Sequence, residues 1–534
     1  MIRALVAAAN ETANATIIAA FNATGNITDD SSVDDSAGSM FGGSDMFGGG
    51  DMFGGGDTGS DPIIDPKVKL AEDIKHRVNI AAVVIPLLIV SGTAIGYMAD
   101  HLFLRKRLKG PASDRPRGWV IGMLVSSYGL LLPGLIFTLF SYSIDAAGGF
   151  MHLSGKTENT FEFAHELAKS GSAAGCFFVV TFAMVIPVVK LVLLVYGGIV
   201  RHSKDEATTS NARRAITFVQ RISKWASPDM FAYILLMYLI RGLDHGFLLG
   251  ARMELDVGFT CFASFCVAST ISSLGVRAPE KRREIPDKHY CSHTAILTTL
   301  GIGCAVVMFV FHLSFLYVGM RTPCMALRLD VDKLIESGQV APEQGPMIKM
   351  LGIETLTADD VNLLDCIRKL YSWVVQDAEN VNFNMNDLTA LILLTIFVIG
   401  FTLMDMVGIL AVAISVHIYA VRPAFWMEFT HIFRKLSMLD VAIVGVVVII
   451  TAGKIYEKLG VVLTSRIGLL YLFAAEFCHY VSYYTVHSIA MAMPPDYDED
   501  DGCDDEDKVH HNGSSSSCDT DMSSEDEHLN GRVG

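Results

Sequence analysis

Two stretches of the chain, Phe218-Val-Gln-Arg-Ile-Ser-Lys224-Trp225-Ala-Ser-Pro-Asp229 and Phe429-Thr-His-Ile-Phe-Arg-Lys435-Leu436-Ser-Met-Leu-Asp440, share one pattern. In each, a phenylalanine lies eleven residues before an aspartate, a lysine lies five residues before it, and an apolar stretch follows. The two copies lie 211 residues apart (435 − 224). A junction repeated at this distance indicates two membrane modules of one design.

The composition is that of a membrane protein. Of 534 residues, 51% are hydrophobic and 18% are charged, whereas soluble domains carry about 25% charged residues. The charges cluster between long apolar runs, as in polytopic proteins. Much of the net charge of −16 lies in the tail Asp496–Glu527, so it says little about the membrane body. No nucleic-acid-binding module is recognisable, and no nucleic-acid partner is expected.

We predict an all-α polytopic membrane protein with about nine transmembrane helices. A spanning helix needs about 20 apolar residues. Such runs are expected to span 78–100, 118–142, 174–199, 229–248, 257–276, 293–319, 387–419, 438–453 and 467–492.

The orientation follows from lysine and arginine residues, which favour cytosolic loops. They are concentrated after the first, third, fifth and seventh expected spans, all on one side. The N-terminus is therefore predicted to be lumenal or extracellular and the C-terminus cytosolic, in an organelle that the sequence does not identify. Four possible N-glycosylation sequons agree with this orientation; they begin at Asn10, Asn14, Asn22 and Asn26.

The apolar runs divide the chain into two tandem four-helix modules and one extra N-terminal span. The second module has a large outer loop, residues 320–386, which contains Cys324 and Cys366. An oxidising compartment favours a disulfide between them, and two free thiols are the alternative. The predicted parts are a disordered Gly/Asp-rich arm (1–75), the extra helix with its basic loop (76–114), the first module (115–289), the second module (290–492) and a disordered acidic tail (493–534).

Lys224-Trp225-Ala-Ser-Pro-Asp229-Met-Phe231 and Lys435-Leu436-Ser437-Met438-Leu439-Asp440-Val441 resemble a junction of the paraquat-inducible protein A (PqiA) family, the LetA-like integral membrane proteins. Ser172-Ala-Ala-Gly175, leading to Val185-Ile186-Pro187-Val-Val-Lys190-Leu191, is similar to a helix of that family with its glycine, proline and lysine. The resemblance covers about residues 115–492. The chain lacks the cysteine-rich zinc ribbons of bacterial members, which indicates a divergent, eukaryotic member.

The resemblance implies tetraspanin-like or TARP-like modules and a role in lipid transport. Bacterial members work with MCE-domain tunnel proteins, so lipids and an MCE-like or other bridge protein are the implied partners. The predicted function is to move lipid along a polar-lined path between the two modules. A tetraspanin-like scaffold and a small-molecule or ion transporter are the alternatives. The membrane body has no G-x-S-x-G, H-E-x-x-H or phosphate-loop motif, so no enzyme activity, cofactor or metal is expected.

Ionisable groups inside spans are the best functional candidates, because burying one in hydrocarbon costs at least a few kcal/mol. Lys190 lies mid-span, and Pro187 is expected to free backbone carbonyls at a similar depth. Asp405, beside Thr402, lies deep in the seventh span. We predict a Lys190–Asp405 pair across the module interface, which protonation of Asp405 would open or close. A purely structural ion pair is the alternative.

In the ninth span, Glu476 and His479 are spaced i, i+3 and share a helix face. A hydrogen-bonded polar patch is expected there, rather than a metal site with Cys478.

The junction residues are predicted to have structural roles. Lys224, Lys435 and Trp225 are expected to anchor the chain at the membrane interface. Asp229 and Asp440 are expected to cap the helices that follow them.

Overall fold

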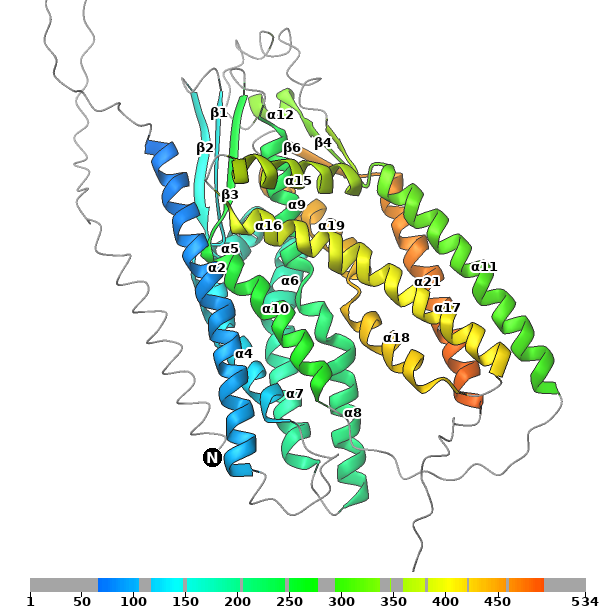
Figure 1. Ribbon diagram of the computed structural model, residues 1–534. Coiled ribbons are helices and arrows are strands. Elements are labelled where there is room, and N and C mark those ends of the chain that lie inside the picture. Colours follow the sequence, from blue (N-terminus) through cyan, green and yellow to red (C-terminus); the bar gives the residue numbers. More distant parts are fainter. Residues whose placement is uncertain are drawn as a thin grey trace, which may run out of the picture.

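A computed structural model describes residues 66–104, 117–146, 151–201, 205–244, 249–276, 293–336, 346, 359–379, 383–419, 422–457 and 461–493 (Figure 1). The predicted glycosylation sites Asn10, Asn14, Asn22 and Asn26, most of the predicted arm and nearly all of the acidic tail lie outside the described residues. Helix α2 (Pro66–Ala99) begins inside the segment predicted to be the disordered arm.

Seven helices in the described ranges are long and apolar enough to cross a membrane, so the chain is a multi-pass membrane protein. They span Glu72–Leu102, Gly118–Ile136, Ala173–Val200, Val257–Gly275, Thr299–Arg321, Met385–Tyr419 and Ala424–Ala452. The predicted number of nine is not confirmed. The expected fourth span is α9 (Pro228–Gly242), whose 15 residues extend about 22 Å, less than a bilayer core. The expected ninth span is α21 (Ile467–Ala492), which is long enough but contains buried Glu476 and His479.

The first half of the chain combines helices with one sheet. In order, its elements are α4 (Gly118–Ile136), β1 (Phe140–Ala146), β2 (Met151–Glu158), α5 (Thr160–Lys169), α6 (Ala173–Val179), η4 (Val180–Val185), α7 (Ile186–Val200), α8 (Glu206–Ile222), η5 (Ser223–Ala226), α9, β3 (Leu249–Leu255) and α10 (Val257–Gly275).

The second half has nearly the same order of elements. They are α11 (His293–Arg321), β4 (Met325–Leu329), α12 (Val331–Glu336), β5 (Asp359–Val361), α15 (Leu363–Glu379), α16 (Met385–Ile392), η6 (Leu393–Gly400), α17 (Phe401–Tyr419), α18 (Ala424–Leu436), α19 (Leu439–Ala452), α20 (Lys454–Glu457), β6 (Val461–Ser465) and α21. In each half one long helix contains a π-helical segment, η4 or η6, of the kind often found at functional sites.

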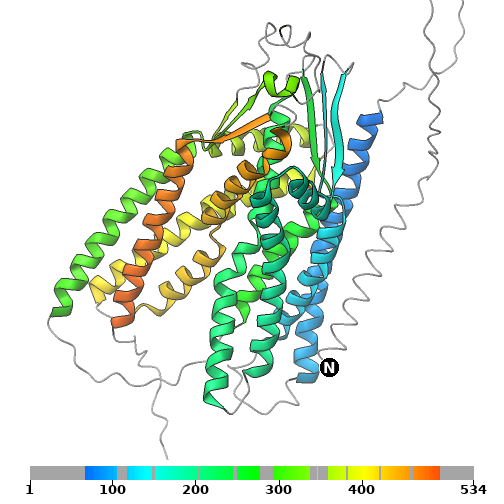
Figure 2. The same cartoon turned by 180° about the vertical axis from the view of Figure 1, so that it is seen from behind.

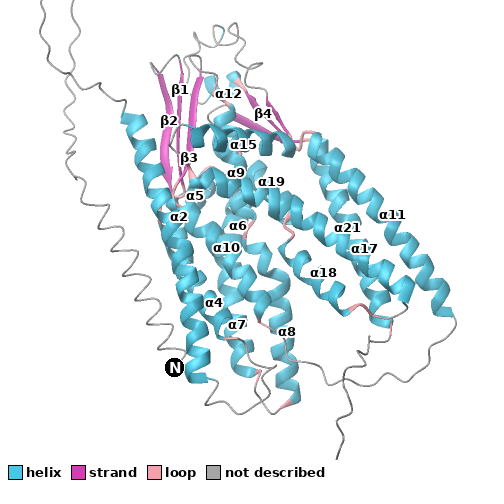
Figure 3. Ribbon diagram, in the orientation of Figure 1, coloured by secondary structure: helices cyan, strands magenta, loops and turns pink. Residues whose placement is uncertain are grey.

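Each half has a three-stranded antiparallel sheet with its first strand in the middle, in the orders β2-β1-β3 and β5-β4-β6. Both sheets lie at the same end of the molecule (Figure 2, Figure 3). The helical predictions missed these sheets. The span expected over 118–142 ends at Ile136, because the next segment alternates buried Phe140, Tyr142 and Ile144 with more exposed serines, as a strand does.

The two halves meet at α9 and α19. Every residue of α9 from Pro228 to Ile240 is buried. A Cβ atom added to Gly445 of α19 would lie 2.9 Å from both the Phe231 Cβ and the Pro228 carbonyl oxygen, so the two helices pack closely. This contact places the two sequence junctions near each other in the centre of the molecule.

The extra helix α2 packs against α4 through two pairs of glycines. Gly92 and Gly96 of α2 face Gly118 and Gly122 of α4. A Cβ added to Gly122 would lie 2.2 Å from the Gly92 carbonyl oxygen, and one added to Gly96 would lie 2.3 Å from the Gly118 carbonyl oxygen. This small-xxx-small spacing allows close helix packing in membranes, and it attaches α2 to the first half.

Candidate functional site

The two similar junctions contact each other through their charged residues. Lys224, in η5, has its Nζ atom 2.7 Å from Asp440 Oδ2 and donates a longer bond of 3.4 Å to the Ser437 carbonyl. Both charged side chains are buried, at 9% and 7% exposure. The lysine of one junction therefore pairs with the aspartate of the other, across the boundary between the halves.

The reciprocal pair is not formed. Lys435 is half-buried and donates to Gln220 Oε1 at 2.9 Å. Asp229 is fully buried, and neither carboxylate oxygen has a hydrogen-bond partner among the described residues. It lines a small apolar cavity together with Tyr233 and Val448. Among the described residues of the two junctions there is thus one charge pair, Lys224–Asp440, and one buried carboxyl group, that of Asp229, that no cation compensates.

These positions correct the predicted roles of the junction residues. Lys224 lies inside the protein rather than at the membrane interface, because α19 covers it. Asp229 does not cap α9: the helix begins at Pro228, and Ser227 precedes it without a side-chain cap. Asp440 is not the N-cap of α19 either, because the helix begins at Leu439 and Met438 precedes it without a side-chain cap. Asp440 does accept a bond from the Val441 N–H at 2.9 Å, in the first turn of α19. Its second oxygen is used by Lys224.

Trp225 also packs against the protein. Its ring is stacked on Phe182 of η4, with the ring centroids 6.4 Å apart, and the residue is half-buried.

Lys190 is enclosed by the first half of the chain. It is fully buried, and its Nζ atom donates to Ser223 Oγ at 2.6 Å and to the carbonyl and hydroxyl oxygens of Ser269 at 2.8 and 3.1 Å. Pro187, one turn earlier, is the second residue after the π-helical segment, and its carbonyl accepts a bond from the Tyr128 hydroxyl at 3.1 Å. The surroundings of Lys190 are polar, as predicted, but they contain hydroxyl groups rather than an acid.

Asp405 finds its partner in the second half. Its Oδ2 atom lies 2.7 Å from His479 Nε2, while His479 Nδ1 lies 3.3 Å from both carboxylate oxygens of Glu476. All three side chains are buried. The predicted Lys190–Asp405 pair is therefore wrong, because each residue bonds to the last helix of its own half. The Thr402 hydroxyl is hydrogen-bonded to Ser437 Oγ at 2.7 Å and not to Asp405.

The two hydrogen-bonded pairs occupy matching positions. Lys190 lies five residues after the end of η4 (190 − 185), and Asp405 lies five residues after the end of η6 (405 − 400). Their partners, Ser269 and His479, each lie twelve residues after the start of α10 or α21 (269 − 257 and 479 − 467). The same place in the fold thus has a lysine in the first half and an acid–histidine pair in the second.

Five residues of this network were not identified from the sequence. The Tyr480 hydroxyl donates to Asp440 Oδ2 at 3.0 Å, and the Arg434 guanidinium lies over the rings of Tyr480, Tyr483 and Tyr484. His312 is fully buried beside His479, with the ring centroids 5.7 Å apart. The spacing of the tyrosines at i, i+3 and i+4 would have placed them on one helix face.

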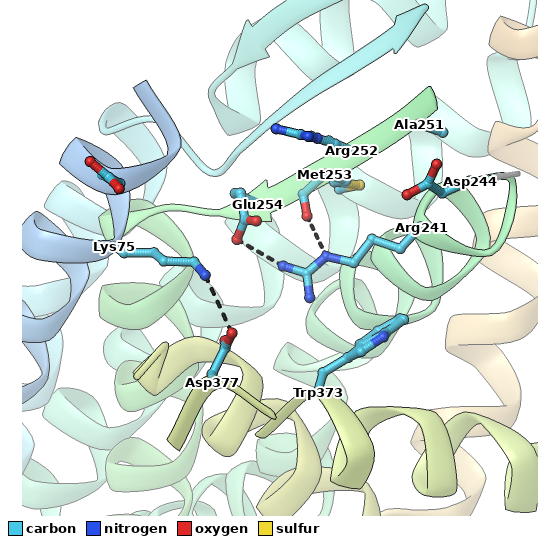
Figure 4. A pocket seen from close by; sticks show the side chains of 10 residues that line it. Lys75, Arg241, Asp244, Ala251, Arg252, Met253, Glu254, Trp373 and Asp377 are labelled. Carbon is cyan, nitrogen blue, oxygen red and sulfur yellow. Dashed lines mark hydrogen bonds and ion pairs between the residues drawn. The ribbon is translucent and has the colours of Figure 1, made fainter. Parts of the chain in front are cut away.

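A second polar contact joins the halves nearer the sheets. Arg241 of α9 donates to Asp387 of α16 at 2.8 Å. It also donates to Glu254 of β3 at 2.7 Å, as Figure 4 shows. Asn384 also bonds to Glu254, at 3.0 Å. Charged pairs of this kind, one near the sheets and one at the junctions, hold the two halves together at two levels.

Cys324 and Cys366 have free thiols, so the predicted disulfide is not formed. Both are buried, Cys324 directly before β4 and Cys366 in α15, and the Cys324 thiol donates to the Val361 carbonyl at 3.3 Å.

Residues 120–278 match the family model described as paraquat-inducible protein A. No curated protein and no solved structure matches the chain. The match covers most of the first half and confirms the predicted resemblance there, so this part of the chain is similar to the PqiA family.

Proposed function

We propose that this PqiA-like protein is the membrane component of a lipid-transport system. The proposal is carried by the charge pair Lys224–Asp440, which is buried where the two halves of a multi-pass membrane protein meet. Buried charges in membrane proteins are costly and mark transport pathways. The family match over residues 120–278 supports the same function.

The path for lipid runs between the two halves in this proposal. The matching order of elements, the matching strand orders and the repeated junction support an origin by duplication, as in many transporters. The sheets would then lie on the lumenal or extracellular side, where an MCE-like or other bridge protein would receive the lipid.

A tetraspanin-like scaffold is the second candidate, and a small-molecule or ion transporter is the third. A scaffold has little need for a lysine and an aspartate buried at an internal interface. An ion transporter would use the same buried groups, so only a measurement of lipid movement separates it from the leading proposal.

The test is a lipid-transfer assay with the full-length protein reconstituted in vesicles. Lys224→Met and Asp440→Asn each leave one buried partner without its counter-charge, and such changes cost about 3–5 kcal/mol. Each variant is expected to lose at least tenfold in transfer rate, and the double variant is expected to lose much less than the product of the single losses. Lys454→Met, an exposed lysine on α20, is the matched control.

Size-exclusion profiles check that each variant is folded. Wild-type transfer of a fluorescent phospholipid at the rate of empty vesicles would refute the proposal. Unchanged lipid transfer in folded Lys224 and Asp440 variants would show that the pair is not part of the path.

A further inference from the structure

A polar cavity of about 380 Å³ lies at the end of the molecule that carries the sheets (Figure 4). It is formed where α2, α9, β3 and α15 meet. Helix α2 is the extra N-terminal helix, and α15 belongs to the large loop 320–386. Four of its ten lining residues, Glu72, Lys75, Trp373 and Asp377, therefore come from segments that this chain adds to its two sets of four helices, and the other six come from the first half. Its volume is in the usual range of ligand pockets, about 300–1,000 Å³.

Several charged groups of the cavity already have partners. Arg241 uses its guanidinium on Glu254, Asp387 and the Met253 carbonyl, and it lies over the Trp373 ring at 4.9 Å. Lys75 and Asp377 form a longer pair, at 3.5 Å. These side chains form the wall of the cavity, and few of their polar atoms remain free to contact a ligand.

Arg252 and Glu72 are the uncommitted charges. Both line the cavity, both are exposed, and neither side chain has a hydrogen bond or ion pair with any described residue. In Figure 4 the Arg252 side chain extends along the cavity above Glu254. A guanidinium matches the geometry of a phosphate group, and a carboxylate matches an ammonium group. One ligand that carries both groups would satisfy both residues.

The lining also selects among phosphate–ammonium ligands. A quaternary ammonium prefers an open aromatic face, but Arg241 already covers the face of Trp373. The charged lining has four acids, Glu72, Asp244, Glu254 and Asp377, against three bases, Lys75, Arg241 and Arg252. An excess of acids disfavours a headgroup with a further negative charge. A primary ammonium that donates hydrogen bonds to carboxylates fits best.

The neighbouring surface of α2 suits acyl chains. Val83, Leu87 and Val90 are 69%, 67% and 63% exposed. They lie 11, 15 and 18 residues after Glu72, about three, four and five helical turns, so they share its helix face. A lipid whose ammonium contacts Glu72 can therefore lay its chains along this exposed apolar stripe.

We propose that the cavity binds the headgroup of a phospholipid with a primary amine, of the phosphatidylethanolamine type. Arg252 contacts the phosphate, Glu72 contacts the ammonium, and the acyl chains lie along α2 in the leaflet next to the sheets. The inference extends the proposed function, because this lipid is the one that a transport path beside the cavity would load or release.

Native mass spectrometry of the full-length protein tests the binding directly. Phosphatidylethanolamine, phosphatidylcholine and phosphatidylglycerol are added in equal amounts, and the bound fraction of each is measured. The wild type is expected to prefer phosphatidylethanolamine. Glu72→Gln and Arg252→Gln each remove one charge-assisted contact and should lower that binding about tenfold. The matched controls are Asp73→Asn on α2 and Arg368→Gln on α15, both exposed and outside the cavity.

Equal binding of the three lipids, or equal losses in the controls, would overturn the assignment. Binding of glycerophosphoethanolamine, the water-soluble headgroup, is measured in the same way. If it binds as tightly as the whole lipid, the acyl chains contribute nothing and the lipid assignment is wrong. The Lys224 and Asp440 variants keep the cavity intact, so they should keep wild-type lipid binding. A transport failure with lipid binding retained would refute the proposed function alone, and transport without selective binding would refute this inference alone.

Discussion

The glycine contacts between α2 and α4 give the sharpest stability prediction. A Cβ on Gly122 would lie 2.2 Å from the Gly92 carbonyl oxygen, whereas ordinary contact begins at 3.4 Å, so the helices would have to separate by about 1.2 Å (3.4 − 2.2). A gap of 0.5–1 Å already loses a quarter to a half of a van der Waals contact. The opposing atoms are backbone, which cannot rotate away. We therefore expect Gly122→Ala or Gly96→Ala to cost about 3 kcal/mol, the upper end of overpacking effects.

A buried reporter can measure this loss. Ser126 of α4 is 8% exposed, and its hydroxyl lies 1.7 Å from the position of a Cβ on Gly92, so α2 covers it. In a Ser126→Cys background, labelling by a membrane-permeant maleimide requires α2 to move away. Because 1.4 kcal/mol is a factor of ten, a loss of about 3 kcal/mol should speed labelling about 100-fold. Peptide-level mass spectrometry separates this site from the native cysteines.

The matched control is Gly303→Ala in α11, where an added Cβ has no neighbour within 4 Å. Alanine is favoured over glycine in helices by about 1 kcal/mol, so this variant should be neutral or slightly more stable. If the maleimide labels Ser126→Cys at the same rate in the Gly122→Ala and Gly303→Ala variants, the glycine contacts do not hold α2 and the reasoning fails.

Three further predictions concern other parts of the protein. His479→Phe leaves Asp405 and Glu476 buried without the histidine, so it should destabilise the protein by about 3–5 kcal/mol in thermal unfolding, whereas the exposed His417→Phe should not. Burial raises the pKa of Cys324 to about 11 and that of Cys366 still further. Since the thiolate is the nucleophile, both cysteines should react with iodoacetamide only after unfolding. A reductant should leave the thermal stability unchanged. Burial also raises the pKa of Glu158, although Lys156 opposes the shift. The folded state then binds this proton more tightly than the unfolded state, so stability should fall as pH rises above the ordinary glutamate pKa of about 4.3. Glu158→Gln should reduce that fall in pH-dependent melting curves.

The helical membrane body could be predicted from the sequence because hydrophobic length is a local signal. The sheets could not be recognised in the same way. Phe140, Tyr142 and Ile144 follow an apolar helix without a polar break. The criterion of about 20 apolar residues for a span therefore includes Phe140 and Tyr142 in the predicted helix. Their period-2 alternation was the signal that distinguishes a strand. The glycines at 92, 96, 118 and 122 also carried a recognisable spacing that predicts close helix packing.

The candidate site was only partly predictable. Lys190, Asp405, Glu476 and His479 were recognised as buried, because a charged residue inside an apolar run is visible in the sequence. Their partners were not, since pairing depends on which helices pack together. The sequence suggests a Lys190–Asp405 pair by charge alone, whereas packing puts Ser269 beside the lysine.

The repeated junction shows why duplication alone does not define the chemistry. Two identical modules facing each other would form two equivalent lysine–aspartate pairs, Lys224–Asp440 and Lys435–Asp229. Only the first is formed, because Lys435 bonds to Gln220 and Asp229 stays buried without a cation. An uncompensated buried carboxyl is costly, and it lies beside the one junction pair that joins the halves. The similarity of the two copies therefore builds the interface, and the differences between them leave it asymmetric.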